Sequence, residues 1–311
     1  MSLARRILLA ASTNPWIRDR AMKAPFVMRS VSRFMPGERI EDAVAAASRL
    51  RREGIATILT HLGENLTTRD EAEGVTRHYL DALDRIEAAD LDAQVSVKPT
   101  QLGLDLDEEL CRRNLDRLAD AAAARGRLLW IDMENARYVD RTLQLFRSVR
   151  ARTPLVGLAL QAYLYRTERD VEELAPLGAA LRLVKGAYLE SPAVAYPKKA
   201  DVDENYFRLA RRILQEHHRP GAMLHVATHD AALIARVDAH LEAANVPRAA
   251  SEYAMLYGIQ VPLQRQLVSA GHRVRVLISY GAQWFPWYMR RLAERPANVG
   301  FVLRSLIGGG R

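Results

Sequence analysis

Short apolar runs recur along the chain, and each is followed by a polar residue and then by an amphipathic segment. The Val, Ile and Leu content of the runs is typical of buried strands, whereas the segments between them repeat apolar residues at the spacing of a helix. Helices of this kind are predicted over residues 41–52, 106–125, 137–152 and 204–217. The eight predicted strands begin at Ala56, Ala93, Arg127, Val156, Leu181, Ala222, Ala249 and Arg273.

Strands that alternate with helices in this way predict an α/β fold, a (β/α)8 TIM barrel. The chain has 311 residues, 49% of them hydrophobic, which suffices for one large core. No Gly/Ser-rich linker divides it, so residues 1–311 are predicted to form a single catalytic barrel domain. Residues 1–50 are expected to form an N-terminal helical extension before the first strand.

The chain contains one cysteine, Cys111, which excludes a disulfide framework and a cysteine-based zinc site and favours a reducing compartment. The apolar run near the amino terminus is about five residues long, shorter than the ~7–15 residues of a signal peptide. No stretch approaches the ~20 apolar residues of a membrane span. We therefore expect a cytoplasmic protein and leave open a peripheral contact at the inner face of the cell membrane.

The net charge is +8 and the isoelectric point is near 9.8, which raises nucleic acid or an anionic membrane as partners. However, the 45 Lys and Arg residues are interspersed with 37 Asp and Glu residues, and no long basic block occurs. This pattern favours a solvated basic surface, and no nucleic-acid partner is predicted.

Polar residues stand at the ends of the predicted strands, and in a TIM barrel the carboxyl ends of the strands carry the chemistry. Any one of these residues could instead cap the following helix or meet solvent. As a ring they predict one site at the barrel mouth. They are Glu64, Lys98, Asp132, Glu134, Gln161, Tyr163, Lys185, Tyr188, Thr228, His229 and Asp230.

Other kinds of site are less well supported. His225 and His229 are four residues apart, about 13 Å along a strand, too far to bind one metal ion, and no metal site is predicted. No G-x-G-x-x-G follows a strand, so a Rossmann-type dinucleotide site is not expected. Lys98 and Lys185 stand where a Schiff-base lysine of a barrel aldolase would also stand, and that enzyme class remains an alternative.

A helical segment rich in aromatic residues follows the eighth strand and contains Arg290, Arg291 and Glu294. The glutamate lies four and three residues after the two arginines, so its carboxylate can orient their guanidinium groups toward one anion. A small carboxylate suits such a clamp. Because the flanking residues are aromatic and apolar, we expect this final helix to pack over the barrel mouth.

The segment Y-G-x-x-W-x-P-W-Y-M-R-R-L-A-E-R-P-A-N-V-x-F-V-L-R-S-L closely resembles the C-terminal signature of bacterial monofunctional proline dehydrogenases. These are flavoenzymes built on a distorted (β/α)8 barrel. The resemblance runs from about residue 26 to residue 306 and includes K-P-T-Q-L-G-L-D-L, D-M-E, L-R-L-V-K-G-A-Y and V-A-T-H-D in the same order.

The resemblance implies roles for individual residues. The catalytic set would be Lys98, Asp132, Tyr188, Arg290, Arg291 and Glu294, in which the two arginines and the lysine grip the substrate carboxylate. The substrate-binding set would add Leu256, Leu277 and Tyr280. FAD would be bound non-covalently by Gln161, Arg182, Lys185, Gly186, Ala187, Tyr188, Thr228 and His229, with Arg182 near the flavin N5.

The resemblance also implies the reaction. L-proline would be oxidised to 1-pyrroline-5-carboxylate by hydride transfer from C5 to flavin N5, the first step of proline catabolism. The electrons would pass to membrane quinone. A homo-oligomer is left open.

Four positions depart from the family pattern. Leu277 and Ser279 stand where the family has tyrosine and proline, Ala254 stands where glutamine is frequent, and Pro99 follows Lys98. Pro99 should restrain Lys98 to extended geometry. The shorter, apolar Leu277 should leave more room beside the substrate ring, so the same chemistry on hydroxyproline or pipecolate is an alternative to plain proline.

Overall fold

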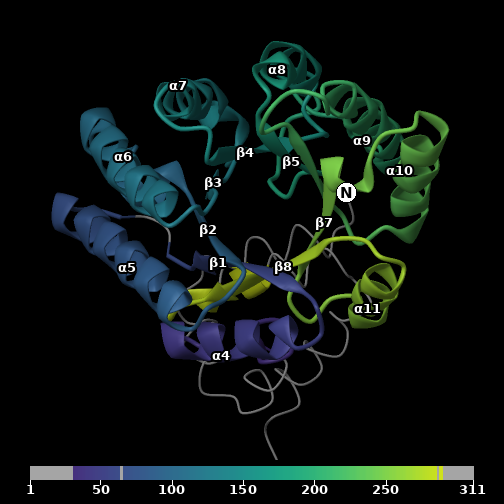
Figure 1. Ribbon diagram of the computed structural model, residues 1–311. Coiled ribbons are helices and arrows are strands. Elements are labelled where there is room, and N and C mark those ends of the chain that lie inside the picture. Colours follow the sequence, from purple (N-terminus) through teal and green to yellow (C-terminus); the bar gives the residue numbers. More distant parts are fainter. Residues whose placement is uncertain (1–30, 64–65, 286, 290–311) are drawn as a thin grey trace, which may run out of the picture.

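Eight parallel strands close a barrel in the order of the chain, and β8 pairs back onto β1 (Figure 1). The structure is a computed structural model, and it describes residues 31–63, 66–285 and 287–289. The strands are β1 (Ala56–His61), β2 (Ala93–Val97), β3 (Leu129–Ile131), β4 (Val156–Gln161), β5 (Ala180–Val184), β6 (Met223–Ala227), β7 (Ser251–Leu256) and β8 (Val274–Tyr280).

The α-helices form a ring around the strands (Figure 1). They are α4 (Ile40–Arg51), α5 (Arg69–Ala88), α6 (Glu108–Ala124), α7 (Val139–Arg150), α8 (Thr167–Leu174), α9 (Lys199–Leu214), α10 (Ala231–Ala243) and α11 (Val261–Ser269). Short 3-10 helices lie at η1 (Pro99–Leu102), η2 (Ala136–Tyr138), η3 (Ala175–Leu177) and η4 (Arg248–Ala250).

Each of the eight predicted strands is present, which confirms the TIM barrel. Of the predicted N-terminal extension, the described part contains α4, and residues 1–30 lie outside the described residues. Residues 284–285 and 287–289 are helical and buried, and the rest of the predicted final helix lies outside the described residues.

Helix α9 begins five residues before the predicted residue 204. An ion pair between Lys199 and Asp203, one helical turn apart, supports the added turn. Val202 also extends the buried face of the helix toward its amino terminus. Because most residues of this turn are polar, the sequence shows no apolar periodicity there from which a helix could be predicted.

Side-chain caps fix where several helices begin after a strand. Thr68 and Glu71 form a reciprocal capping box at the start of α5. Asp107 accepts hydrogen bonds from two backbone N–H groups of α6, and Asp230 does the same for α10. For Asp230, one of the polar residues at the strand ends, helix capping is therefore part of its role.

Alternate residues of the strands point into the barrel. Arg182 on β5 contacts Asp132 after β3 and Ser96 on β2, and because these strands are not neighbours, the contacts must cross the interior. Deeper inside lies a small apolar cluster around Ile58 and Trp130. The outward-facing residues belong to the main core between strands and helices.

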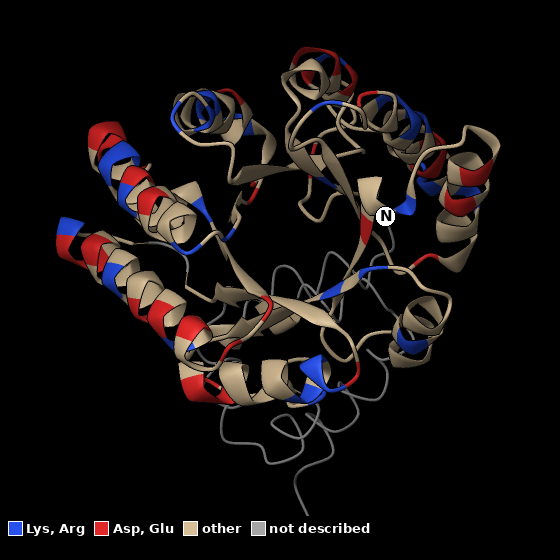
Figure 2. Ribbon diagram, in the orientation of Figure 1, with Lys and Arg blue, Asp and Glu red and all other residues tan. Residues whose placement is uncertain are grey.

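The outer helices carry both signs of charge in alternation, as Figure 2 shows. Many of these charges are paired, for example Arg125 with Asp84 and Glu87, and Arg212 with Glu172 and Glu216. Within the described part of the chain, no helix combines the length and the apolar character needed to cross a membrane.

Candidate active site at the carboxyl ends of the strands

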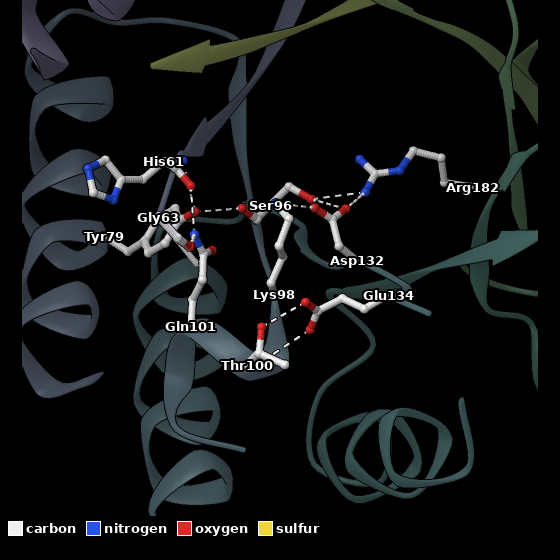
Figure 3. A network of polar contacts seen from close by, with 10 residues as sticks. All are labelled: His61, Gly63, Tyr79, Ser96, Lys98, Thr100, Gln101, Asp132, Glu134 and Arg182. Carbon is white, nitrogen blue, oxygen red and sulfur yellow. Dashed lines mark hydrogen bonds and ion pairs between the residues drawn. The ribbon is translucent and has the colours of Figure 1, made fainter. Parts of the chain in front are cut away.

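Asp132 is the centre of a charged cluster in the barrel interior (Figure 3). Its Oδ1 accepts a hydrogen bond of 2.8 Å from Ser96 Oγ and another from Arg182 Nη2. Lys98 Nζ lies 3.4 Å from the other oxygen, Oδ2. Strands β2, β3 and β5 thus bring two cations onto one carboxylate, and the predicted residues Lys98, Asp132 and Arg182 are brought together.

The two cations determine the charge state of Asp132. Burial opposes ionisation of its carboxyl group, but Arg182 and Lys98 outweigh burial and hold the pKa below its ordinary value of 3.8. Asp132 is therefore ionised at neutral pH. The cluster of Lys98, Asp132 and Arg182 then has a net charge of +1, counted as two cations and one anion.

Arg182 is only 3% exposed, so its hydrogen bonds matter for the stability of the cluster. Nη2 donates to Asp132 and, at 2.9 Å, to Ser96 Oγ. Nη1 is buried, and no group among the described residues accepts a hydrogen bond from it. A buried cationic donor without an acceptor indicates a place for a ligand with an acceptor atom.

The loop after β2 is fixed by Glu134, which follows β3. Thr100 donates to the Glu134 carboxylate from its N–H at 3.1 Å and from its hydroxyl at 2.7 Å. Gln161 Nε2 donates at 2.7 Å to the Glu134 backbone carbonyl. Lys98, before Pro99, has φ −102° and ψ 133°, which confirms the extended geometry expected from the proline. Glu134 and Gln161 thus hold the mouth loops together.

The K-G-A-Y segment after β5 is held by an ion-pair network. Lys185 Nζ donates to Asp203 at 2.5 Å and to Asp230 at 2.9 Å. Gly186 has φ +120°, and a Cβ there would lie 2.2 Å from the Tyr163 ring. Only glycine fits this position, so Tyr163 packs directly against the backbone of the turn. The turn that carries Ala187 and Tyr188 is therefore rigidly defined at its start.

Thr228 and His229 follow β6 and connect it to its neighbours. Thr228 Oγ1 accepts from Asp230 N–H at 3.2 Å. His229 Nε2 accepts from the Leu256 N–H at 2.9 Å, which joins the end of β6 to the end of β7. This bond requires Nε2 to be unprotonated, so a neutral His229 has its hydrogen on Nδ1. His229 and Leu256 are thus brought together at the mouth.

The two predicted substrate residues of β8 lie on opposite faces of the strand. Leu277 faces the interior, partly buried against the cluster of Ile58 and Trp130. Tyr280 is fully buried on the outer face, where its hydroxyl lies 2.9 Å from His78 Nε2 on α5. The assignment of Tyr280 to the substrate site is therefore wrong, because it lies three positions after Leu277 and the period of a strand is two.

The structure does not give the positions of four predicted site residues. Glu64, Arg290, Arg291 and Glu294 lie outside the described residues. Just before the arginines, Trp284 is buried and donates from its indole N–H to Glu38 at 3.0 Å.

The two histidines weighed as metal ligands have separate roles. His225 is fully buried in the interior with Nε2 2.8 Å from Glu252 Oε2, whereas His229 bonds to Leu256. Among the described residues there is no group of three or more His, Cys, Asp or Glu side chains placed to hold a metal ion.

Ser96 and Trp130 belong to the site but were not predicted from the sequence. Ser96 is two residues before Lys98, and Trp130 is two residues before Asp132. The two-residue period of a strand puts each pair on the same face. The residue two positions before each polar residue at a strand end is therefore the signal in the sequence that predicts both Ser96 and Trp130.

The fold and its charged interior define a TIM-barrel protein of the kind that carries its chemistry at the carboxyl ends of the strands. The chain belongs to the proline dehydrogenase family, whose sequence profile matches residues 43–304. It is 36% identical over 305 residues to proline dehydrogenase 1 of Bacillus subtilis strain 168, covering 98% of this chain and 99% of that protein. It is also 36% identical over 312 residues to the proline dehydrogenase of Deinococcus radiodurans, covering 99% of each.

The fold also matches solved structures. Proline utilization A (PutA) from Bdellovibrio bacteriovorus, inactivated by N-propargylglycine, superposes with a TM-score of 0.82 at 22% identity. The match covers 96% of this chain and 36% of that one, so this chain spans about a third of the PutA polypeptide. This likeness supports the fold.

Proposed function

We propose that the protein is an FAD-dependent proline dehydrogenase that oxidises L-proline to 1-pyrroline-5-carboxylate, with residues 1–311 as one catalytic domain. The observation that carries the proposal is the cluster of Lys98, Asp132 and Arg182 inside the barrel, in a chain of the proline dehydrogenase family. It supplies a fixed positive charge and a buried donor where a flavin and a carboxylate substrate would meet.

The residues of the interior fit a flavin. Arg182 Nη1 is a buried donor without an acceptor among the described residues, and flavin nitrogen and oxygen atoms are acceptors. We assign Arg182 and Gln161 to the flavin ring. Lys185, Gly186, Ala187, Tyr188, Thr228 and His229 are assigned to the rest of the cofactor. The Lys185 ammonium is already paired with Asp203 and Asp230, so its contribution is to hold the turn that carries Gly186.

The substrate carboxylate is assigned to Arg290 and Arg291, oriented by Glu294, with Lys98 beside them. Lys98 is 12% exposed and is held by Asp132, so its ammonium is fixed rather than free to follow solvent. A cation held in advance, as Lys98 is, reduces the entropy lost when the substrate binds and orients its ring. Tyr188, Leu256 and Leu277 are assigned to the ring itself.

When bound, FAD would supply the two-electron acceptor for the hydride of proline C5, and the ring nitrogen would form the C=N bond of the product and release its proton. The chain's own residues act by position and charge. The net positive cluster disfavours an ammonium and so favours the neutral ring nitrogen, whose lone pair the reaction requires. The same charge stabilises the negative charge that develops on reduction.

Other partners follow from the same proposal. We infer that the electrons leave to membrane quinone, reached by a peripheral contact of a cytoplasmic enzyme. A homo-oligomer is compatible with the proposal and is not needed for it.

The Schiff-base aldolase receives no support. A Schiff-base lysine needs its nitrogen free to attack a carbonyl. Lys98 Nζ is engaged by Asp132, and Lys185 Nζ is engaged by both Asp203 and Asp230.

A second candidate is the same chemistry on a substituted or larger ring, such as hydroxyproline or pipecolate. It is favoured by one observation: Leu277 faces the interior and packs against the apolar cluster of Ile58 and Trp130. Leucine has neither the hydroxyl group nor the aromatic face of the family's tyrosine. Proline remains the first expectation.

The test is the visible spectrum of the purified protein, recorded anaerobically before and after addition of L-proline. A flavin band that bleaches with L-proline is the expected result. A flavin band that responds to hydroxyproline or pipecolate but not to proline would support the second candidate. A colourless protein that cannot be reconstituted with FAD would overturn the flavoenzyme proposal.

A further inference from the structure

Trp130 crosses the barrel interior directly beneath the charged cluster. It is fully buried, and it lies on the same face of β3 as Asp132, two residues deeper. The guanidinium carbon of Arg182 is 4.9 Å from the centre of the Trp130 ring. Arg182 thus rests with its cation over an aromatic face, a contact that gains strength where water is excluded.

The indole is itself held from several sides. Its N–H donates to Gln94 Oε1 on β2 at 2.7 Å. On β4, Gly157 leaves the room for the ring, since a Cβ at that position would lie 2.6 Å from two of the ring carbons. On β6, the ring of His225 lies 4.3 Å away, centre to centre. Strands β2, β4 and β6 therefore each fix one side of Trp130.

His225 cannot move away from Trp130 without breaking a second buried link. Its Nε2 lies 2.8 Å from Glu252 Oε2, and the same oxygen accepts from Arg275 Nε at 2.8 Å. His225, Glu252 and Arg275 are each 2% exposed or less. The Arg275–Glu252 hydrogen bond is buried and resists rearrangement, and it holds the carboxylate against His225, whose ring nitrogens have no hydrogen-bond partner among the described residues.

Asp132 alone does not fix Arg182. Asp132 and Ser96 both accept hydrogen bonds from the guanidinium, but from the same nitrogen, Nη2, so these bonds hold one corner of the group. The aromatic face of Trp130 contacts the plane of the guanidinium away from that corner. This contact sets the direction of Nη1.

We propose that Trp130 is a positioning residue that fixes the guanidinium plane of Arg182, so that Nη1 is presented to the flavin in one orientation. The inference rests on the proposed function, because it assigns the flavin as the acceptor. It adds a role for a residue that acts through Arg182.

The first test measures the midpoint potential of bound FAD in the Trp130→Phe and Trp130→Leu variants. A loosened Arg182 stabilises the reduced flavin less. Trp130→Leu is therefore expected to lower the equilibrium constant for reduction about tenfold, or about 30 mV for a two-electron couple. Trp130→Phe keeps an aromatic face and is expected to show a smaller shift. In both variants kcat should fall more than KM changes.

A matched control separates this role from general loss of packing. Phe146→Leu removes a fully buried aromatic ring from α7 in the outer core. It is expected to lower stability without changing the midpoint potential. Equal potentials in the wild type and Trp130→Leu, or an equal shift in Phe146→Leu, would overturn the proposal.

The second test needs no flavin. Urea unfolding of Trp130→Leu, Arg182→Gln and the double variant forms a thermodynamic cycle. A cation and a ring in contact should give changes in the folding equilibrium constant that depart from additivity by about threefold to thirtyfold. Additivity within about twofold would overturn the positioning role. If the wild type binds no FAD, the proposed function fails while this cycle still decides whether Trp130 holds Arg182.

Discussion

Thr100 and Glu134 are joined by two hydrogen bonds, one from the Thr100 hydroxyl and one from its backbone N–H, to the two oxygens of the same carboxylate. Thr100 belongs to η1 after β2, and Glu134 follows β3. The pair therefore ties together two loops at the barrel mouth, and Lys98 lies at the start of one of them.

Replacing Thr100 by valine keeps the shape of the side chain and removes the hydroxyl donor. Because Glu134 is only 6% exposed, the change should lower the free energy of unfolding by about 1–3 kcal/mol. KM for proline should also rise, since the loop positions Lys98. Urea unfolding and steady-state kinetics measure the two effects. Thr100→Ser, which keeps the hydroxyl, is the control, and equal losses in both variants would show that the bond is unimportant.

Asp132 should stabilise the fold in a pH-dependent way. Its pKa is lower in the folded state than the ordinary 3.8, so its contribution is present above that pH and is lost as pH falls toward the folded pKa. Asp132→Asn should therefore be less stable than the wild type by about 3 kcal/mol at pH 7, and the gap should narrow at pH 3. Urea unfolding at both pH values measures the gap.

A surface carboxylate provides the comparison for that experiment. Asp201 is exposed near the start of α9, and Asp201→Asn should change stability little at either pH. A gap for Asp132→Asn that is as large at pH 3 as at pH 7 would contradict the assigned ionisation of Asp132.

Gly157→Ala should be destabilising because the added methyl group meets the Trp130 ring. The cost of such overpacking is about 1–3 kcal/mol. Phenylalanine at position 130 lacks the outer part of the indole that the methyl group meets, so the Gly157→Ala, Trp130→Phe double variant should lose less stability than the sum of the single changes. Thermal or urea unfolding of the three variants measures the difference.

The control for this prediction is Gly74→Ala on α5, where a Cβ meets only Arg77 Nη2 at 3.7 Å. There the change should stabilise the protein by up to about 1 kcal/mol, because alanine favours a helix over glycine. Strict additivity of the Gly157 and Trp130 changes would show that the two residues do not compete for the same space.

Leu277→Tyr should narrow the substrate range. A larger side chain fills the space beside the substrate ring, so kcat/KM for pipecolate and hydroxyproline should fall relative to proline by about tenfold. Side-by-side kinetics on the three substrates measures the ratio. Leu277→Met, of similar volume and without a hydroxyl, should keep the original ratio. Unchanged relative rates in Leu277→Tyr would reject the role of Leu277 in selectivity.

The strands could be predicted because buried parallel strands are continuous apolar runs, and a helix follows each from β1 to β7. Strand ends were less certain. The third strand was predicted to begin at Arg127, but β3 begins at Leu129. The guanidinium group of Arg127 donates hydrogen bonds to the backbone carbonyl groups of Leu91 and Ala93. The side chain of Arg127 thus serves as a link to the neighbouring segment.

The candidate site was partly predictable for the same reason. Lys98 and Asp132 were found because a polar residue at the end of an apolar run is conspicuous. Tyr280 was misassigned although β8 does alternate, with Arg275, Leu277 and Ser279 on the inward face and Tyr280 on the apolar outward face. The pairing of Lys185 with Asp203 and Asp230 joins three segments of the chain, and no local pattern could have revealed it.

The barrel closes where its first strand, β1, pairs with its last strand, β8, through six residue pairs, from Ala56 with Arg275 to His61 with Tyr280. More than two hundred residues separate these partners, so during synthesis the edge of β1 stays open until β8 leaves the ribosome. A nascent chain halted before residue 274 would expose two unpaired strand edges at once, on β1 and on β7. Such edges readily pair with other chains, and the last strand to be made is therefore the one that protects the whole barrel from aggregation.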